Sequence, residues 1–149
     1  MIDYRVIQFS DHLDDLDQML YEHWIEMGKH RDEVPLDPDY ICAATLQDSE
    51  HLLTIGVFDD EEMVGYSINI LTPLLHSRDT LGAQNAVLWL RPQYRKGFTG
   101  VRLIQYTEMM AKHMGCKIFL LSARPDTVMF ELLPKLKYDV HETVYSRVL

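Results

Sequence analysis

The sequence has little cysteine and no long apolar run. Its two cysteines among 149 residues, Cys42 and Cys116, form no metal or redox motif. No apolar stretch approaches the roughly 20 residues that cross a bilayer. The opening residues, MIDYRVIQFSDHLDD, lack the basic and apolar regions of a secretory signal. These absences predict a reduced, cytoplasmic protein with no membrane partner.

Basic residues are also in deficit. The chain has 14 Lys and Arg against 23 Asp and Glu, which gives a formal net charge of −9. Nucleic-acid binding requires a basic face, so nucleic acid is not an expected partner. An acidic surface instead favours a cationic partner such as an amine. The length suits one domain, spanning residues 1–149.

Hydrophobic periodicity predicts an α/β domain with a mixed sheet. The expected strands cover residues 4–9, 52–58, 63–71, 86–90 and 117–122, with one or two more at 138–149. Two expected helices begin after Ser10 and after Asp37, and two more cover residues 99–114 and 126–136. The polar segments 29–35 and 76–84 are expected to be loops.

The segment RPQYRKGFTG, residues 91–100, lies between a buried strand and the start of a helix. The first amides of a helix have no internal partner and attract anions. Gly97 and Gly100 let a phosphate approach the backbone, and Arg95, Lys96 and Arg102 add positive charge. The segment fits neither a P-loop nor the dinucleotide fingerprint. It is therefore either a pyrophosphate site or a surface turn with solvated cations.

This segment resembles the acyl-CoA pyrophosphate loop of the GCN5-related N-acetyltransferase (GNAT) superfamily, whose pattern is Gln/Arg-x-x-Gly-x-Gly/Ala. Arg95 matches the first position and Gly100 the last, while Phe98 replaces the middle glycine and Gly97 stands one residue early. Lys135–Tyr138 is similar to the end of the family's last helix. Other segments resemble a bacterial and phage-encoded branch; they are His23-Trp24, His76–Leu81 and Asn85–Leu90.

The resemblance implies a single GNAT-like domain, with a mostly antiparallel sheet, a splayed central strand pair and flanking helices. It implies acetyl-CoA as co-substrate, no metal, and an amine acceptor that is a small molecule or a protein. A homodimer is compatible with the family. The implied cofactor contacts are Leu88, Trp89 and Leu90 along the pantetheine, and Arg95, Lys96, Gly97, Phe98, Thr99, Gly100 and Val101 around the pyrophosphate.

The catalytic residues are less apparent. Many members protonate the leaving thiolate with a tyrosine of the last helix, and Leu133 takes that place here. Tyr145 is the substitute candidate, unless it is a structural strand residue or the thiolate leaves without an acid. His76 is the candidate base, because histidine titrates near neutral pH and the loop is expected near the substrate mouth. It could equally be an ordinary loop histidine.

The end of the first helix supplies the candidate acceptor-binding residues Glu22, His23 and Glu26. Glu22 and Glu26 lie one turn apart and share a face, where they either bind a cationic amine or are simply solvated. Cys116 is expected to be a packing residue. The leading hypothesis is an acetyl-CoA-dependent N-acetyltransferase. The competing hypothesis is a catalytically weak or inactive acyl-CoA- or partner-binding protein on the same scaffold.

Overall fold

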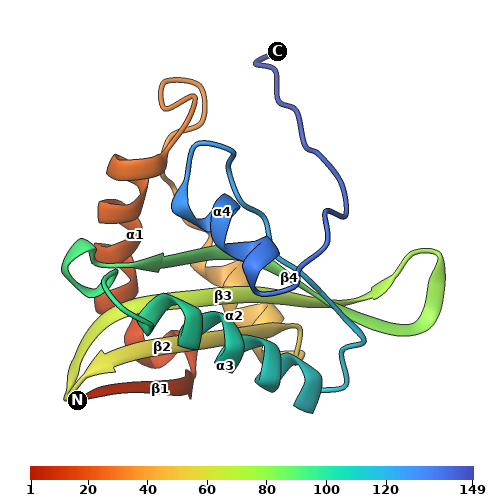
Figure 1. Cartoon of the computed structure of the whole chain (residues 1–149), viewed down its shortest axis with the longest axis horizontal. Helices are drawn as coiled ribbons and strands as arrows, with labels where there is room; N and C mark the ends of the chain where they lie inside the picture. The colour runs from red at the N-terminus through yellow and green to blue at the C-terminus, as the bar shows by residue number, and fades with distance from the viewer.

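The computed structural model describes all 149 residues, and Figure 1 shows a sheet with helices on both faces. The strands are β1 (Ile2–Ile7), β2 (Leu52–Asp59), β3 (Glu62–Leu74), β4 (Ser77–Leu90) and β5 (Ile118–Leu120). The helices are α1 (Leu13–Met27), α2 (Tyr40–Asp48), α3 (Thr99–His113) and α4 (Val128–Lys135). Short 3-10 turns, η1 (Phe9–His12) and η2 (Pro92–Tyr94), precede α1 and α3. The predicted α/β class is confirmed.

The sheet order follows the chain, β1-β2-β3-β4-β5. Neighbours from β1 to β4 are antiparallel, and β2, β3 and β4 are joined by tight hairpins. Only β5 lies parallel to its neighbour β4, and α3 provides the crossover that a parallel pair needs. The prediction of a mixed, mostly antiparallel sheet is therefore confirmed.

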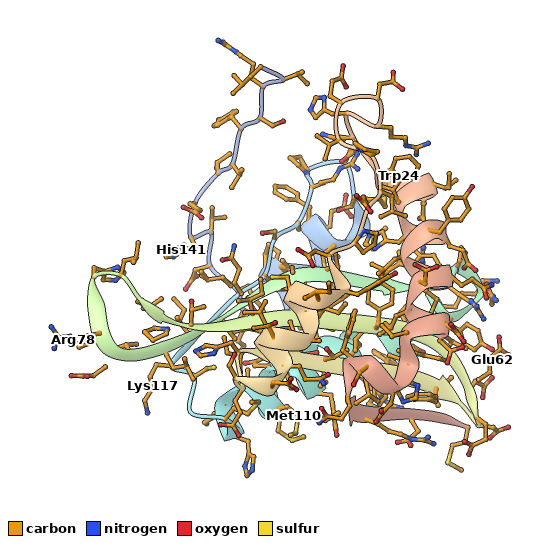
Figure 2. All side chains as sticks on the ribbon, turned by 180° about the vertical axis from the view of Figure 1, so that it is seen from behind. Trp24, Glu62, Arg78, Met110, Lys117 and His141 are labelled. Atoms are coloured by element: carbon orange, nitrogen blue, oxygen red, sulfur yellow. The ribbon has the colours of Figure 1, made fainter.

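The helices cover the two faces of the sheet in pairs. Figures 1 and 2, which view opposite sides, show α1 and α2 on one face and α3 and α4 on the other. Leu16 of α1 packs in a cluster with Tyr66 and Trp89, whereas Leu103 of α3 packs in a second cluster that includes Ile55. Burial of each such side chain contributes about 1.5–3 kcal/mol. The two cores hold the sheet between the helix pairs and fix where its strand ends lie.

Strands β4 and β5 part soon after they pair. Their register runs only from Gly82 to Gln84 on β4, although β4 continues to Leu90. A bulge follows directly, because Asn85 and Val87 face consecutive residues of β3 and leave Ala86 as the extra residue. The predicted splayed pair is present. It lies at the edge of the sheet rather than at its centre, because no strand follows β5.

The structure corrects three boundaries predicted from sequence. The segment 76–84 is not a loop, since β4 begins at Ser77 and forms a long hairpin with β3. The side chain that caps α2 belongs to Asp39, which accepts a hydrogen bond from the Cys42 amide at 2.8 Å, rather than to Asp37. Ser10 lies inside η1 and does not cap α1.

The C-terminal segment forms no strand. Residues 136–149 lack regular structure, and residues 139–149 are all exposed. Figure 1 shows this segment leaving the body of the molecule after α4. The prediction of one or two final strands at 138–149 is therefore wrong, because alternating apolar residues form a strand only where a neighbouring edge pairs with them.

The two cysteines differ in environment, because Cys42 of α2 is exposed and Cys116 is buried before β5. Burial raises the pKa of the Cys116 thiol, in agreement with a packing role. No helix has both the length and the apolar character needed to cross a membrane. No group of three or more His, Cys, Asp or Glu side chains is arranged to hold a metal ion.

Candidate functional site

The parting of β4 from β5 leaves backbone groups of β4 without a strand partner. The Arg91 amide donates to the Val64 carbonyl of β3 at 2.9 Å, so Arg91 faces β3. The backbone N–H and C=O groups of successive strand residues point to opposite sides. Those of Trp89 therefore also point to β3, while those of Leu88 and Leu90 point to the side away from β3. No strand runs on that side beyond Gln84. Of the three predicted pantetheine residues, Leu88 and Leu90 thus present backbone groups to the gap, and Trp89 does not.

The start of α3 offers free amides next to this gap. The Arg102 amide is the first in α3 that donates to a carbonyl one turn earlier, that of Phe98, at 2.9 Å. The Phe98 side chain accepts no hydrogen bond from the first helix amides. The amides of Thr99, Gly100 and Val101 therefore have no partner in the protein. These amides and the positive end of the helix dipole form the kind of site that binds phosphate.

Two glycines shape the turn before α3. Gly97 adopts a φ of +73°, a left-handed conformation that favours glycine. A Cβ added at Gly100 would meet only the Leu90 side chain, at 3.6 Å, so the backbone there is open to a ligand. The exposed Lys96 and Arg102 form no ion pair and leave their charges available. The open turn and the unpaired cations Lys96 and Arg102 expected for this segment are therefore present.

Arg95, unlike Lys96 and Arg102, is engaged in contacts within the protein. Its two terminal nitrogens each lie 2.5 Å from an oxygen of Glu26, and its Nε donates to the Leu90 carbonyl at 2.8 Å. Trp89 donates through Nε1 to Glu26 at 2.8 Å, and the guanidinium lies 5.6 Å from the centre of the Trp89 ring. The Arg95 guanidinium beside Glu26 lowers the pKa of that carboxyl to about 2. Arg95 and Glu26, predicted for separate cofactor and acceptor sites, form one ion pair.

His23 joins the same cluster from the adjacent turn of α1. Its ring stacks on Trp89 with centroids 5.9 Å apart and an interplanar angle of 16°. Its Nδ1 lies 2.8 Å from the hydroxyl of the fully buried Tyr66, and its Nε2 has no partner. Burial lowers the pKa of His23, and the nearby Arg95 charge lowers it further while Glu26 opposes this. The imidazole is therefore neutral near pH 7.

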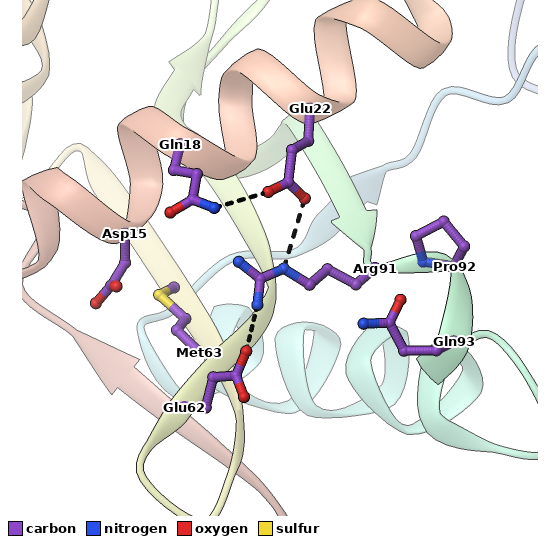
Figure 3. A pocket seen from close by; sticks show the side chains of 8 residues that line it. All are labelled: Asp15, Gln18, Glu22, Glu62, Met63, Arg91, Pro92 and Gln93. Atoms are coloured by element: carbon purple, nitrogen blue, oxygen red, sulfur yellow. Dashed lines mark hydrogen bonds and ion pairs between the residues drawn. The ribbon is translucent and has the colours of Figure 1, made fainter.

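Glu22 is also paired, at the edge of a polar cavity of about 510 Å³ between α1 and the start of β3. Figure 3 shows the Arg91 guanidinium between Glu22, at 3.5 Å, and Glu62, at 2.5 Å. The predicted view of Glu22 and Glu26 as free carboxylates for a cationic acceptor is therefore wrong, since arginines of the 91–95 turn occupy both.

His76 lies far from this cluster. It is exposed at the tip of the β3-β4 hairpin, roughly 27 Å along β4 from Gln84 at about 3.4 Å per residue. Figure 2 labels its neighbour Arg78 at one end of the sheet and Glu62, the partner of Arg91, at the other. A base must come within hydrogen-bond reach of its proton, so this position does not support His76 as the base.

The tyrosine candidates stand outside the cluster as well. Tyr145 is 89% exposed on the C-terminal segment, where the neighbouring Ser146 Oγ lies 3.5 Å from His30 Nε2. Leu133 is buried on α4. Tyr138 is partly buried against Phe119 and donates to Glu108 at 3.2 Å, as a packing residue does.

Sequence reasoning missed the polar residues beneath the parting point. Ser67, Asn69 and Asn85 are all buried, and the Asn85 amide donates to Asn69 Oδ1 at 2.9 Å and to Ser67 Oγ at 3.1 Å. The same nitrogen lies 3.1 Å from the Val87 carbonyl, across the bulge, so its two hydrogens are shared among these acceptors. Polar residues inside a predicted apolar strand are the signal that could have identified this cluster. Tyr66 and Arg91, the partners of His23 and Glu22, left no such signal.

Comparison with known proteins gives no match by sequence, because no family profile and no curated protein matches the chain. Solved structures do match. An aminoglycoside acetyltransferase from an uncultured soil metagenomic sample has a TM-score of 0.77 and 16% identity, over 99% of this chain and 95% of that one. A ribosomal-protein-alanine N-acetyltransferase from Brucella melitensis biovar Abortus 2308 has a TM-score of 0.74 and 15% identity, over 100% and 99%.

A further match is an aminoglycoside N-acetyltransferase in complex with CoA, with a TM-score of 0.71 and 17% identity over 100% of this chain and 95% of that chain. These likenesses extend over whole chains at low identity, so they establish the fold. The single α/β domain has the fold of the GNAT acetyltransferases.

Proposed function

We propose that this chain, which has the GNAT fold, is an acetyl-CoA-dependent N-acetyltransferase that acts on a primary amine of a small molecule or a protein. The carrying observation is the free Leu88 backbone beside the unpartnered amides of Thr99 to Val101, where β4 leaves β5. The acetyltransferases similar in fold, one of them bound to CoA, support this reading. The same reading makes the chain a member of the GNAT superfamily. Its place in a bacterial or phage-encoded branch remains a prediction from sequence.

The residues fit an acyl-CoA. The amides of Thr99, Gly100 and Val101 would hold the pyrophosphate, Lys96 and Arg102 would supply positive charge, and the Leu88 backbone would be available to an amide of the pantetheine arm. Bound acetyl-CoA supplies an activated thioester, whose carbonyl the amine attacks directly. The protein contributes mainly by holding the two reactants in line and by offering amides to the developing oxyanion.

His23 replaces His76 as the candidate proton acceptor in this proposal. It is neutral near pH 7, its Nε2 is free, and it stacks on Trp89, which follows Leu88 in β4. A base must be unprotonated at the operating pH. Activity should rise with pH through the lowered pKa of His23, and this rise should disappear in His23→Gln. An unchanged pH profile in that variant would exclude His23 and leave water as the proton acceptor.

Cofactor binding is tested at Gly100. A glutamate there adds bulk and negative charge where the pyrophosphate is held, so Gly100→Glu should abolish CoA binding in a calorimetric titration. Gln105→Glu is the matched control, because it adds the same charge on an exposed position of the same helix and should change the affinity less than twofold. Unchanged CoA affinity in Gly100→Glu would refute the site.

A second function, acyl-CoA or partner binding without turnover, is favoured by the absence of a tyrosine from α4 and by the exposure of Tyr145. Coenzyme A thiolate is a good leaving group, and the acid is therefore dispensable in the first proposal. Thiol release from acetyl-CoA separates the two functions when it is measured with a panel of primary amines. Binding without release across the panel would establish the second.

A further inference from the structure

Two carboxylates of α1 meet two arginines of the turn that leads into α3. Glu22 and Glu26 are one helical turn apart, and Arg91 and Arg95 are spaced equally around η2. Glu22 lies 3.5 Å from the Nε of Arg91, while Glu26 and Arg95 form a bidentate pair at 2.5 Å. Arg91 also pairs with Glu62 of β3 at 2.5 Å. The end of α1 is thus joined to the turn at two points.

The contacts of Arg95 leave it little capacity for another ligand. Its Nε is bonded to the Leu90 carbonyl, its two terminal nitrogens to Glu26, and its plane lies over Trp89. A bidentate charged pair is both strong and geometrically specific. To reach a phosphate, Arg95 would have to give up its ion pair with Glu26, which would keep only the Trp89 indole N–H, and leave the Leu90 carbonyl without its donor.

We infer that Arg95 and Glu26 are positioning residues: together they hold the 91–98 turn so that the α3 amides face the pyrophosphate, and Arg95 is not itself a phosphate ligand. This inference rests on the proposed acyl-CoA function. Arg95 also donates to the Leu90 carbonyl, so Leu88 is the last residue of β4 whose carbonyl on the open side has no donor. The negative charge of the phosphates is then neutralised by Lys96 and Arg102, which are exposed and form no ion pair.

The variant Glu26→Gln distinguishes the two possible roles of Arg95 by the direction of its effect. If Arg95 positions the turn, loss of the Glu26 charge loosens the turn and weakens CoA binding by about tenfold, which is about 1.4 kcal/mol. If Arg95 binds phosphate, Glu26→Gln frees it and strengthens CoA binding. Tighter binding in Glu26→Gln would therefore overturn the inference.

Three further variants complete the test. Arg95→Lys keeps the charge but loses the fork, so it should weaken CoA binding as much as Glu26→Gln does. The exchange Glu26→Arg with Arg95→Glu should recover part of the affinity lost in either single change, which a general loss of stability would not produce. Asp14→Asn, which removes a charge from the same helix at an exposed site without an ion pair, should leave CoA affinity unchanged. Full CoA affinity in Arg95→Lys would count against the positioning role.

Amide hydrogen exchange without ligand provides an independent readout. Glu26→Gln should accelerate exchange of the amides of residues 93–101 while the amides of β2 and β3 keep their protection. If the unmodified protein does not bind CoA, the proposed function fails. The exchange measurement still decides the positioning role in that case, because faster local exchange supports it and unchanged exchange in 93–101 refutes it.

Discussion

At the scale of single residues, the partners of charged and titratable groups decide what those groups do. His23 is one turn of helix from exposed side chains, yet its ring is placed between Trp89 and the Tyr66 hydroxyl. Burial there penalises the charged imidazole and lowers its pKa. Protonation of His23 is therefore less favourable in the folded state than in the unfolded state, where the ring is solvated.

We predict that His23 makes stability fall in mildly acidic solution. Below its ordinary pKa of about 6.5 the unfolded chain binds a proton at His23 that the folded chain rejects, so the free energy of unfolding decreases as pH falls toward the lowered value. Urea unfolding at pH 7.5 and pH 5 should show a smaller decrease for His23→Gln than for the unmodified protein. Because the other histidines are common to both proteins, equal decreases would show that His23 does not contribute.

The sequence predicted local chemistry well and long-range pairing poorly. Gly97, Gly100 and Lys96 stand in one short segment, and their roles as an open, cationic helix start were readable from that segment alone. The pair of Glu26 and Arg95 joins positions 69 residues apart. No periodicity connects such positions, so both residues were expected to be free. Their mutual neutralisation depends on how α1 crosses the end of β4, which only the folded chain shows.

At the scale of elements, the bulge in β4 depends on a buried polar cluster. Asn85 lies before the bulge and donates across it to the Val87 carbonyl, and it also bonds Ser67 and Asn69 of β3. A buried network of this kind is stabilising only when all of its members are satisfied. The cluster fixes the position of the bulge, and with it the point at which β4 leaves β5.

Replacement of Asn85 should therefore destabilise the protein without changing its surface. Asn85→Ala removes the donor of these bonds and should lower the free energy of unfolding by about 2–3 kcal/mol. Gln84→Ala, at the neighbouring exposed position, should change it by less than about 0.5 kcal/mol. Denaturant unfolding measures both, and equal values for the two variants would contradict a structural role for the cluster.

Element boundaries were predicted where an apolar face exists and missed where it does not. The first half of β4 was predicted to be a loop because the segment is polar, and Figure 1 shows that it belongs to a hairpin that extends beyond the helices. The 138–149 segment was predicted to form one or two strands. In both segments the deciding factor is a neighbouring strand, which β3 provides for β4 and nothing provides for the C-terminal segment.

At the scale of the whole molecule, stability resides in the two apolar clusters on either face of the sheet. Both clusters draw on residues before Tyr138. Residues 139–149 bury no side chain and make no backbone hydrogen bond to the rest of the protein. They should thus contribute almost nothing to the cooperative unfolding of the domain.

Removal of residues 139–149 should leave the melting temperature within about 2 °C of the full chain, because a change of 1 kcal/mol shifts a domain of this size by about 2–4 °C. Differential scanning calorimetry of the shortened and full-length chains tests this. A large drop would mean that the segment pairs with the free edge of β5 in solution. The same shortened protein would also reveal, by its turnover, whether Tyr145 takes any part in catalysis.

The unequal environments of the two cysteines have a practical consequence for spectroscopy. A thiol-reactive fluorophore should attach at the exposed Cys42 and spare the buried Cys116, whose raised pKa keeps it as the thiol. The dye would then be carried by α2, on the face of the sheet opposite α3. Unmutated protein could thus be observed at a single known point while a ligand binds at the start of α3, with no label in the way.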